Sequence, residues 1–311
     1  EYPLDSISNA SIATNFFQPV NSMGIAIGDY DEDGDMDYYI TDIGAQNLYR
    51  NDNYYFNEVA AIAGVDDPNA ELPGYTFYPK VGWGTGFLDY DNDTYLDLFV
   101  VYGMLNFDLL IQENKLFRND SATGTFTDIS HAAGIADMEI SRGFAYADYD
   151  RDGDLDAVVV VIDSVGGSKN VKLYRNDLNN SHNWLQILCE GRINNRDGLG
   201  TRIEVHFDGR KLIREVGGGG ASIQSQHSNV THFGLGTATM LDSLVIRWLG
   251  GGKDVYYNVS SNQILKAIEH VGLFPDTQLV VFETTTICQG DSVFIGGEYQ
   301  SSPGTYLDTT N

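Results

Sequence analysis

Hydrophobic and polar positions alternate over short distances along this chain, in repeating blocks. In the first block, small and apolar residues alternate over GIAIG, an acidic segment follows, and the run YYI stands at 38–40. The runs LFVV at 98–101 and VVVV at 158–161 hold the same place in two later blocks. Alternation of period two and β-branched or aromatic runs between turns predict strands. Helical periodicity is absent apart from one short turn near 58–64.

Three segments align with one another. They are residues 24–40, 84–100 and 142–160, whose leading acids Asp29, Asp89 and Asp148 lie 60 and 59 positions apart. Each unit later carries LYRN or LFRN, ending at Asn51, Asn119 and Asn176. Between units stands YFNEVAAIAGV (55–65) or TFTDISHAAGI (125–135), and LDSISNASI at 4–12 is a degenerate copy of that phrase. With two further short strands from these phrases, each unit of about 60 residues predicts the four strands of one propeller blade.

Acidic side chains alternate along the loop between the first two strands of each unit. Counted from the leading acid, positions 1, 3, 5 and 9 of the loops at 29–37, 89–97 and 148–156 are all aspartates: Asp29, Asp31, Asp33 and Asp37; Asp89, Asp91, Asp93 and Asp97; Asp148, Asp150, Asp152 and Asp156. Position 7, which can offer its backbone carbonyl, is Asp35, Tyr95 or Asp154. Ca²⁺ takes about six to eight hard oxygen ligands, which carboxylates alternating on a tight loop supply. We therefore expect about three calcium sites.

Other interpretations of these loops are weaker on physical grounds. A solvated acidic turn would leave four carboxylates within nine residues repelling one another. An EF-hand needs glutamate at position 12, where these loops have Ile40, Val100 and Val159. Magnesium prefers fewer protein ligands in strict octahedral geometry. General acid catalysis needs a raised pKa, whereas calcium holds its carboxylate ligands ionised.

The sharp turn of each loop falls at position 6. Gly34 and Gly153 permit that turn in the first and third loops. The second loop has Thr94 there, so it departs from the pattern.

Overall charge adds a second reason to expect cations. The 311 residues include 44 Asp and Glu but only 18 Lys and Arg, which gives a net charge of −26. Such a charge repels nucleic acid and anionic lipid. The longest wholly apolar run, residues 157–162, is too short to cross a bilayer. We expect neither nucleic acid as a partner nor membrane insertion.

The chain contains two cysteines, Cys189 and Cys288, too few for a disulfide framework or a zinc site. Buried free thiols are the simplest interpretation, and a bridge between the two is the alternative. The first residue is Glu1 and no signal peptide is visible, so we expect a processed or artificial end.

The sequence pattern changes after Asn176. Alternating segments follow at 183–191, 201–209, 211–216, 231–236, 241–251 and 262–269, with the turn cluster NNRDGLG at 194–200. This pattern predicts an all-β module of roughly 90 residues.

Several residues of this module invite a functional interpretation. The run Gly217–Gly220 precedes no helix start and lacks the Lys-Ser/Thr of a P-loop, so we expect a tight bend or close packing against the repeats. His227 and His232 have no evident third metal ligand, which favours ordinary polar or core histidines. No G-x-S-x-G or local Cys–His phrase indicates a nucleophile. We expect acids to pair with Arg202, Arg214 and Arg247, some across the domain interface.

The acidic repeats resemble the FG-GAP/VCBS repeats of integrin-type β-propellers, whose loops follow D-x-[DN]-x-D-G-x-x-D, over residues 4–178. The following module closely resembles the ASPIC/UnbV domain through NNRDGLGTRIEV, REVGGGGASIQSQ, HFGLG and DSLVIRW. Where that domain usually reads W-P-x-G, this chain has WLGG at 248–251. ASPIC/UnbV domains commonly follow FG-GAP/VCBS repeats in secreted proteins such as cartilage acidic protein, and the resemblance implies no catalytic chemistry.

From Val271 the chain runs into LVVFETTTICQGDSVFIGGEYQSSPGTYLDTTN, with the pattern C-x-G-D-S … G-x-Y-x-D. This tail resembles the opening of small repeated β-modules in secreted surface proteins of Bacteroidetes. That resemblance implies a polypeptide continuing past Asn311, in which Cys288 would find a partner. The resulting expectation is an all-β protein with propeller repeats at 1–178, an ASPIC/UnbV-like β-domain at 179–270, and a linker with the start of a further module at 271–311.

A propeller typically has about four to eight blades, and only three units are recognisable. Three explanations stay open. Upstream blades are missing, the second module completes the ring of sheets, or exposed blade edges pair with another chain.

These features favour a secreted or cell-surface, calcium-stabilised adhesion or recognition module without catalysis, whose propeller loops bind a glycan or an extracellular protein. Aromatic residues near the loops either stack on sugar rings or pack between blades: Tyr75, Phe77, Tyr78 and Trp83. A self-associating subunit of a filament or surface layer is one alternative. A polysaccharide lyase or hydrolase is another. It would need a carboxylate pair outside the calcium loops, and nothing singles out a pair among Glu113, Asp128, Asp137 and Glu139.

Overall fold

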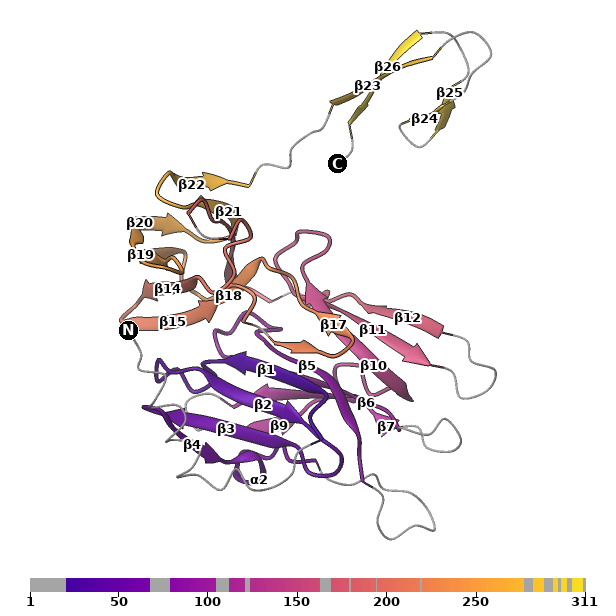
Figure 1. Ribbon diagram of the computed structural model, residues 1–311, viewed down its shortest axis with the longest axis vertical. Helices are drawn as coiled ribbons and strands as arrows, with labels where there is room; N and C mark the ends of the chain where they lie inside the picture. The colour runs from indigo at the N-terminus through magenta and orange to yellow at the C-terminus, as the bar shows by residue number, and fades with distance from the viewer. Residues whose placement is uncertain are drawn as a thin grey trace. The chain divides into compact units, whose positions relative to one another are not determined.

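The protein is described from a computed structural model (Figure 1). The structure describes residues 21–67, 79–104, 112–120, 124–162, 169–178, 180–193, 195–218 and 220–276, and the strands at 282–287, 293–295, 298–300 and 304–309. The chain forms two compact units, Glu1–Phe274 and Pro275–Asn311. Within the described residues every element is a strand except the single-turn helix α2 (Ala60–Ala63), so the all-β prediction is confirmed.

The first two acidic repeats each fold into a four-stranded antiparallel sheet. Blade 1 contains, in order, β1 (Gly24–Gly28), β2 (Asp37–Thr41), β3 (Asn47–Asp52) and β4 (Tyr55–Glu58). Blade 2 contains β5 (Gly82–Leu88), β6 (Asp97–Tyr102), β8 (Lys115–Asn119) and β9 (Phe126–Asp128). The LYRN-type phrase forms the third strand and the phrase between units forms the fourth, as the sequence predicts.

The third repeat forms three of the four expected strands. Blade 3 contains β10 (Met138–Ala147), β11 (Asp156–Ile162) and β12 (Lys169–Tyr174). Its sheet has the order β12-β11-β10-β7, in which β7 (Gln112–Glu113) pairs with the start of β10. Within the described ranges no strand lies on the outer side of β12.

Glycines allow the first strands of the three blades to lie against one another. The strand β5 contacts both β1 and β10. A Cβ on Gly24 would overlap the carbonyl oxygen of Trp83, and one on Gly84 would lie 2.8 Å from the backbone nitrogen of Phe144. Apolar side chains fill the space between blades 1 and 2, among them Tyr30, Tyr39, Leu98 and Phe126. The blades therefore pack directly, backbone against backbone at the centre and through apolar side chains further out.

Residues 183–275 form the C-terminal domain, which is built from two four-stranded sheets that share one core. One sheet has the order β18-β13-β21-β22, made of β18 (Thr231–Gly236), β13 (Asn183–Glu190), β21 (Gln263–Ile268) and β22 (Gly272–Pro275), with β13 and β21 parallel. The other has the order β15-β14-β19-β20, made of β15 (Arg210–Glu215), β14 (Arg202–Phe207), β19 (Met240–Arg247) and β20 (Lys253–Ser260). Leu185, Ile187, Ile203, Phe233 and Leu244 are buried in their common core.

A short hairpin of the C-terminal domain reaches into the repeats, as Figure 1 shows beside β1 and β5. Its strands β16 (Ala221–Ser222) and β17 (Ser225–Gln226) extend the sheet of blade 1, because β16 pairs with β1. The hairpin also contacts β5 and β10. A Cβ on Gly220 would overlap the carbonyl oxygen of Ile25, so the close packing expected for the glycine run is present at this position. The second module thus contributes two strands to the sheet of blade 1.

The second compact unit holds two antiparallel strand pairs. In one, β23 (Phe282–Ile287) pairs with β26 (Gly304–Thr309). In the other, β24 (Val293–Ile295) pairs with β25 (Glu298–Gln300).

Candidate metal centres in the acidic loops

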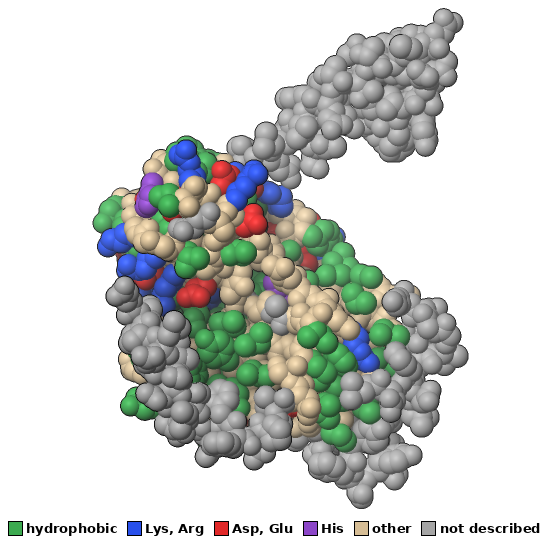
Figure 2. Space-filling view, viewed as in Figure 1, with side chains coloured by type: hydrophobic (Ala, Val, Ile, Leu, Met, Phe, Trp, Pro, Cys, Tyr) green, Lys and Arg blue, Asp and Glu red, His purple; other side chains and the backbone are tan. Residues whose placement is uncertain are grey.

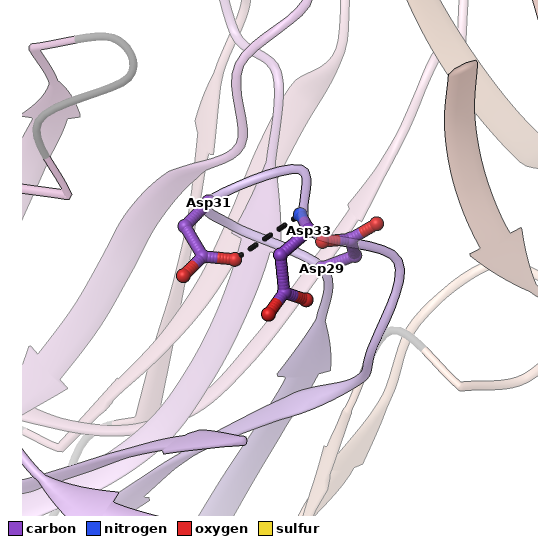
Figure 3. Close-up of side chains that lie close together, drawn as sticks. All are labelled: Asp29, Asp31 and Asp33. Carbon is purple, nitrogen blue, oxygen red and sulfur yellow. Dashed lines mark hydrogen bonds between the residues drawn. The ribbon is translucent and has the colours of Figure 1, made fainter. Parts of the chain in front are cut away.

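Each acidic loop is closed by hydrogen bonds from its own backbone to its aspartates. The carboxylate at position 1 accepts a bond from the N–H at position 6, over 3.3, 2.9 and 3.0 Å in the three loops. The carboxylate at position 9 accepts a bond of 3.1 Å from the N–H at position 2 in every loop. Figure 3 shows Asp29, Asp31 and Asp33 of the first loop close together, with the Asp33 N–H donating to Asp31 Oδ1 at 3.3 Å.

The three loops share one backbone conformation. Position 4 has positive φ in each loop, with values of 60° at Glu32, 58° at Asn92 and 63° at Arg151. Position 6 is also left-handed, with 101° at Gly34, 94° at Thr94 and 103° at Gly153. Positive φ is an outlier for a β-branched residue. The surrounding structure therefore forces Thr94 into a conformation that suits glycine.

This backbone brings three carboxylates together in every loop, with oxygens that lie within 4.8 Å of one another. The three sets are Asp29, Asp31 and Asp33; Asp89, Asp91 and Asp97; and Asp148, Asp150 and Asp156. Positions 1 and 3 belong to all three sets.

The remaining predicted ligands lie outside these sets, and they are Asp35, Asp37, Asp93, Tyr95, Asp152 and Asp154. Asp35 Oδ2 accepts a bond of 2.8 Å from the Asn53 N–H, and Asp154 Oδ1 accepts one of 2.8 Å from Asn92 Nδ2. Tyr95 stays a predicted carbonyl ligand.

Burial and mutual repulsion disfavour the ionised form of these aspartates. Burial above all raises the pKa of Asp29 to about 7, and the nearby charges of Asp31 and Asp33 add to the effect. Burial likewise raises the pKa of Asp37 to about 9 and that of Asp93 to about 6. The pKa of the fully buried Asp89 lies well above its ordinary value for the same reason. A divalent cation among these oxygens would offset both burial and repulsion.

The donor set suits Ca²⁺. It consists of hard, anionic oxygens spaced along a tight loop, which calcium prefers, and several of them are buried and form no ion pair with a Lys or Arg among the described residues. The carboxylates at positions 1 and 3, with the third member of each set, would hold the ion. A bound ion would supply positive charge at a point where the loop is otherwise self-repelling.

The asparagine that ends each LYRN-type phrase ties neighbouring loops together. Its backbone N–H donates to the aspartate at position 9, over 2.8 Å for Asn51, 2.9 Å for Asn119 and 2.8 Å for Asn176. Asn119 Nδ2 also donates to the Tyr30 carbonyl of the first loop at 2.9 Å, and Asn176 Nδ2 to the Tyr90 carbonyl of the second at 2.6 Å. The signal for these contacts in the sequence is the asparagine repeated at the end of each phrase.

The C-terminal domain packs directly on all three loops. Arg202 Nη2 donates to the Gly34 carbonyl of the first loop at 2.7 Å. The ring nitrogen His182 Nδ1 lies 2.8 Å from the Asp91 carbonyl of the second loop. Gln186 Nε2 donates to Asp148 of the third loop at 2.6 Å. The acidic loops thus connect the two domains as well as the strands within each blade.

Charge complementarity accompanies this contact. Residues 179–270 carry nine Lys or Arg against eight Asp or Glu, whereas residues 1–178 carry nine against 31. Figure 2 shows Lys and Arg side chains gathered over the C-terminal domain. Arg210 pairs with Glu32 of the first loop at 2.6 Å, and its guanidinium lies 4.8 Å from the ring centre of Tyr95 in the second.

Three arginines were expected to pair with acids, and each has different surroundings. Arg247 pairs within its own domain, with Glu204 at 2.6 Å, and Arg202 lies 3.7 Å from the same carboxylate. Arg214 is buried, and Asp89 and Asp29 are its strongest charge partners, so it faces two acidic loops. Arg214 thus interacts electrostatically with acids across the domain interface, but among the described residues it forms no ion pair with them.

Other sequence candidates occupy structural positions. Trp83 is 7% exposed, and its indole N–H donates to the Gly103 carbonyl at 2.6 Å. The Arg142 guanidinium lies over its ring, 4.1 Å from the ring centre. Trp83 therefore packs between elements and cannot stack on a sugar. Tyr75, Phe77 and Tyr78 lie outside the described residues.

Two histidines and one cysteine are buried. Burial lowers the pKa values of His227 and His232 to about 4, and each places Nε2 within 3.1 Å of a backbone carbonyl, as core histidines do. Cys189 is buried in the C-terminal core, and burial raises its thiol pKa to about 12. Cys288 lies outside the described residues.

The four acids considered for catalysis are held by lysines. Lys115 bridges Glu113 and Asp128 at 3.0 and 2.8 Å, and Lys172 bridges Asp137 and Glu139 at 2.9 and 2.8 Å. Burial alone would raise the pKa of Asp128 and Asp137, but the hydrogen bonds that each accepts lower it instead. A lowered pKa is the opposite of what a general acid needs.

Comparison with protein families agrees with this architecture. Residues 89–159 match the family model of the FG-GAP-like repeat, from the second acidic loop through the third. Residues 191–272 match the family model described as ASPIC and UnbV. The chain contains both domain types. Comparison with curated proteins finds no match.

These two domain types are those of extracellular recognition or adhesion-type modules. Among the described residues, no helix has the length and apolarity that crossing a bilayer needs.

Proposed function

We propose that this protein is a non-catalytic, calcium-stabilised recognition module of a secreted or cell-surface protein, which binds a glycan or an extracellular protein. The observation that carries the proposal is the position of the three acidic loops. Each groups three aspartates, and each is in contact with the C-terminal domain. Calcium in these loops would hold the blades and that domain in one arrangement.

A polar cleft beside the third loop supports the choice of a polar ligand. It has a volume of about 330 Å³ and is lined by Asp152, Asp154, Asp177, Leu178, Asn180, His182 and Trp184. Asp150 and Asp152 are exposed, so this loop is the most open of the three. Carboxylates, an amide and an indole ring are groups that bind sugar hydroxyls and ring faces.

The test is a glycan array with calcium-loaded protein, repeated in EGTA, with Asp177→Asn and Asn180→Ala as cleft variants. Asp242→Asn is the matched control, because Asp242 is an exposed acid on β19. We expect saturable binding that EGTA abolishes and the cleft variants weaken at least several-fold. An array without binding, together with a melting temperature that calcium raises, would reject a glycan and leave a protein ligand. A melting temperature unchanged by EGTA would reject the calcium role.

A further inference from the structure

The third strand of blade 3 is uncovered, although its counterparts in the other blades are covered. Leu48 in β3 and Leu116 in β8 are 0% and 4% exposed, whereas Leu173 at the same place in β12 is 54% exposed. Two positions earlier, Val171 is 68% exposed and its counterpart Asn114 is 0% exposed. The sequences of the three strands match, but the exposed fractions of their side chains do not.

The cover in blades 1 and 2 is the fourth strand and the turn that follows it. The N–H of Val59 donates to the Leu48 carbonyl at 2.8 Å, and the N–H of Ile129 donates to the Leu116 carbonyl at 3.0 Å. In the described part of the chain, no backbone group bonds in this way to Leu173. An apolar edge strand left open in this way invites another strand to pair with it.

A cavity of about 370 Å³ lies beside the open edge, between blades 2 and 3. Its lining includes Tyr90, Ala133, Ile135 and Tyr174. The equivalent positions between blades 1 and 2 are Tyr30, Ala63, Val65 and Phe117. There, Phe126 of the fourth strand β9 joins them in one buried core, with its ring 5.6 Å from that of Tyr30. A cavity of about 150 Å³ holds a benzene ring, so this one has room for side chains of a missing strand.

The chain holds three copies of the fourth-strand phrase, and the described structure uses two. Residues 55–65 and 125–135 supply β4 and β9. The third copy, LDSISNASI at 4–12, lies outside the described residues, as does Pro3 before it. We propose that residues 3–12 form the fourth strand of blade 3, pairing with β12 and filling the cavity.

The pairing follows from the ungapped alignment that places Ile12 on Ile135 and Ala10 on Ala133. Asp5 corresponds to Asp128, which stands opposite Phe117 in blade 2, so Asp5 faces Tyr174 and Leu4 faces Arg175. Pro3 replaces Phe126 with a smaller apolar ring, and an outermost strand tolerates its missing N–H. Eleven residues separate Ile12 from Gly24, which allows a reach of at most about 40 Å.

The test is disulfide trapping in the calcium-loaded full chain, with Cys288→Ser as background. Leu4→Cys combined with Arg175→Cys places two thiols on directly opposite residues, a spacing that a disulfide can span. Leu4→Cys combined with Lys253→Cys is the control, because Lys253 is exposed on β20. After mild oxidation, we expect the 4–175 bridge within one chain, at least ten-fold above the control bridge. An unchanged melting temperature of the reduced variant shows that it folds.

A bridge between two chains would overturn the proposal in favour of a second copy that donates the strand. Equal yields from the two cysteine pairs would overturn it as well. In a second measurement, deletion of residues 1–13 lowers the melting temperature by several degrees, and a synthetic peptide of residues 1–14 restores it. A deletion that leaves the melting temperature unchanged would contradict the proposal.

Discussion

Replacing Thr94 by glycine is expected to stabilise the protein. Thr94 adopts φ 94° at the turn of the second acidic loop, where the other loops have glycine. It is also 2% exposed, and its hydroxyl has no hydrogen-bond partner among the described residues. Thr94→Gly removes the side chain that causes both costs and keeps the backbone N–H that donates to Asp89 at 2.9 Å.

The magnitude follows from four contributions to the free energy of unfolding. Left-handed strain in a residue other than glycine costs about 1–3 kcal/mol. A buried hydroxyl without a partner costs about 1–3 kcal/mol. Against these, burying the Thr94 methyl contributes about 0.8 kcal/mol. The extra freedom of glycine in the unfolded chain costs about 0.4–1 kcal/mol. The net gain is about 2 kcal/mol, which in a domain of this size raises the melting temperature by roughly 4–8 °C.

Thermal unfolding followed by circular dichroism, in saturating calcium, measures the effect. Thr94→Ala is the matched control, because it removes the hydroxyl but keeps a Cβ at positive φ, so it should recover only about half the gain. Gly34→Thr is the reciprocal change. A Cβ there would lie 3.2 Å from the flexible end of Lys211, so backbone strain more than crowding should lower its melting temperature.

A Thr94→Gly variant that melts at or below the wild-type temperature would refute this reasoning. Equal gains from Thr94→Gly and Thr94→Ala would assign the whole effect to the hydroxyl and none to the backbone.

Three further predictions concern the charges and contacts of the loops. Burial raises the pKa of Asp29 to about 7, so the stability that protonated Asp29 contributes in EGTA is complete below about pH 4 and is lost as the pH rises through 7. Calcium binds the ionised form. The gap between the melting temperatures in calcium and in EGTA should therefore widen from pH 5 to pH 8, and a constant gap would contradict this. Asn119→Ala leaves the buried Tyr30 carbonyl without its donor and should lower the free energy of unfolding, measured in urea, by about 2–3 kcal/mol. Asn51→Ala should cost clearly less, because Asn51 makes no described contact with another blade. Similar losses from the two variants would argue against coupling between blades. Arg214→Gln removes a buried cation that faces two acidic loops. It should lower the free energy of unfolding by about 3 kcal/mol in EGTA but by less in calcium, as measured by urea unfolding under both conditions. An equal loss under both conditions would mean that the arginine and the calcium ions do not compensate the same charges.

Much of the local structure could be predicted from the order of residues. The LYRN-type phrase and the phrase that follows it predict two strands, and they form β3 and β4 in blade 1 and β8 and β9 in blade 2. The alternation of aspartates in nine-residue loops predicts that positions 1 and 3 meet, as they do in all three loops. These features depend on backbone geometry over a few residues, so a pattern along the chain is enough to specify them.

Contacts between distant segments could not be predicted in this way. Arg210 meets Glu32 across 178 positions, and Asn176 meets the Tyr90 carbonyl across 86. No periodicity relates such residues, because their meeting depends on which surfaces the blades and the C-terminal domain bring together. The same holds for the open edge of β12: its sequence matches that of the covered strands, and only the packing around it differs.

The sequence alone therefore determined the repeats, their strands and the acidic loops, since each follows from spacing along the backbone. The tertiary structure decided that the C-terminal domain lies on all three loops, that its hairpin contacts the first strand of each blade, and that Thr94 adopts a conformation suited to glycine. These outcomes depend on shape and charge complementarity between surfaces that form only after the strands have paired.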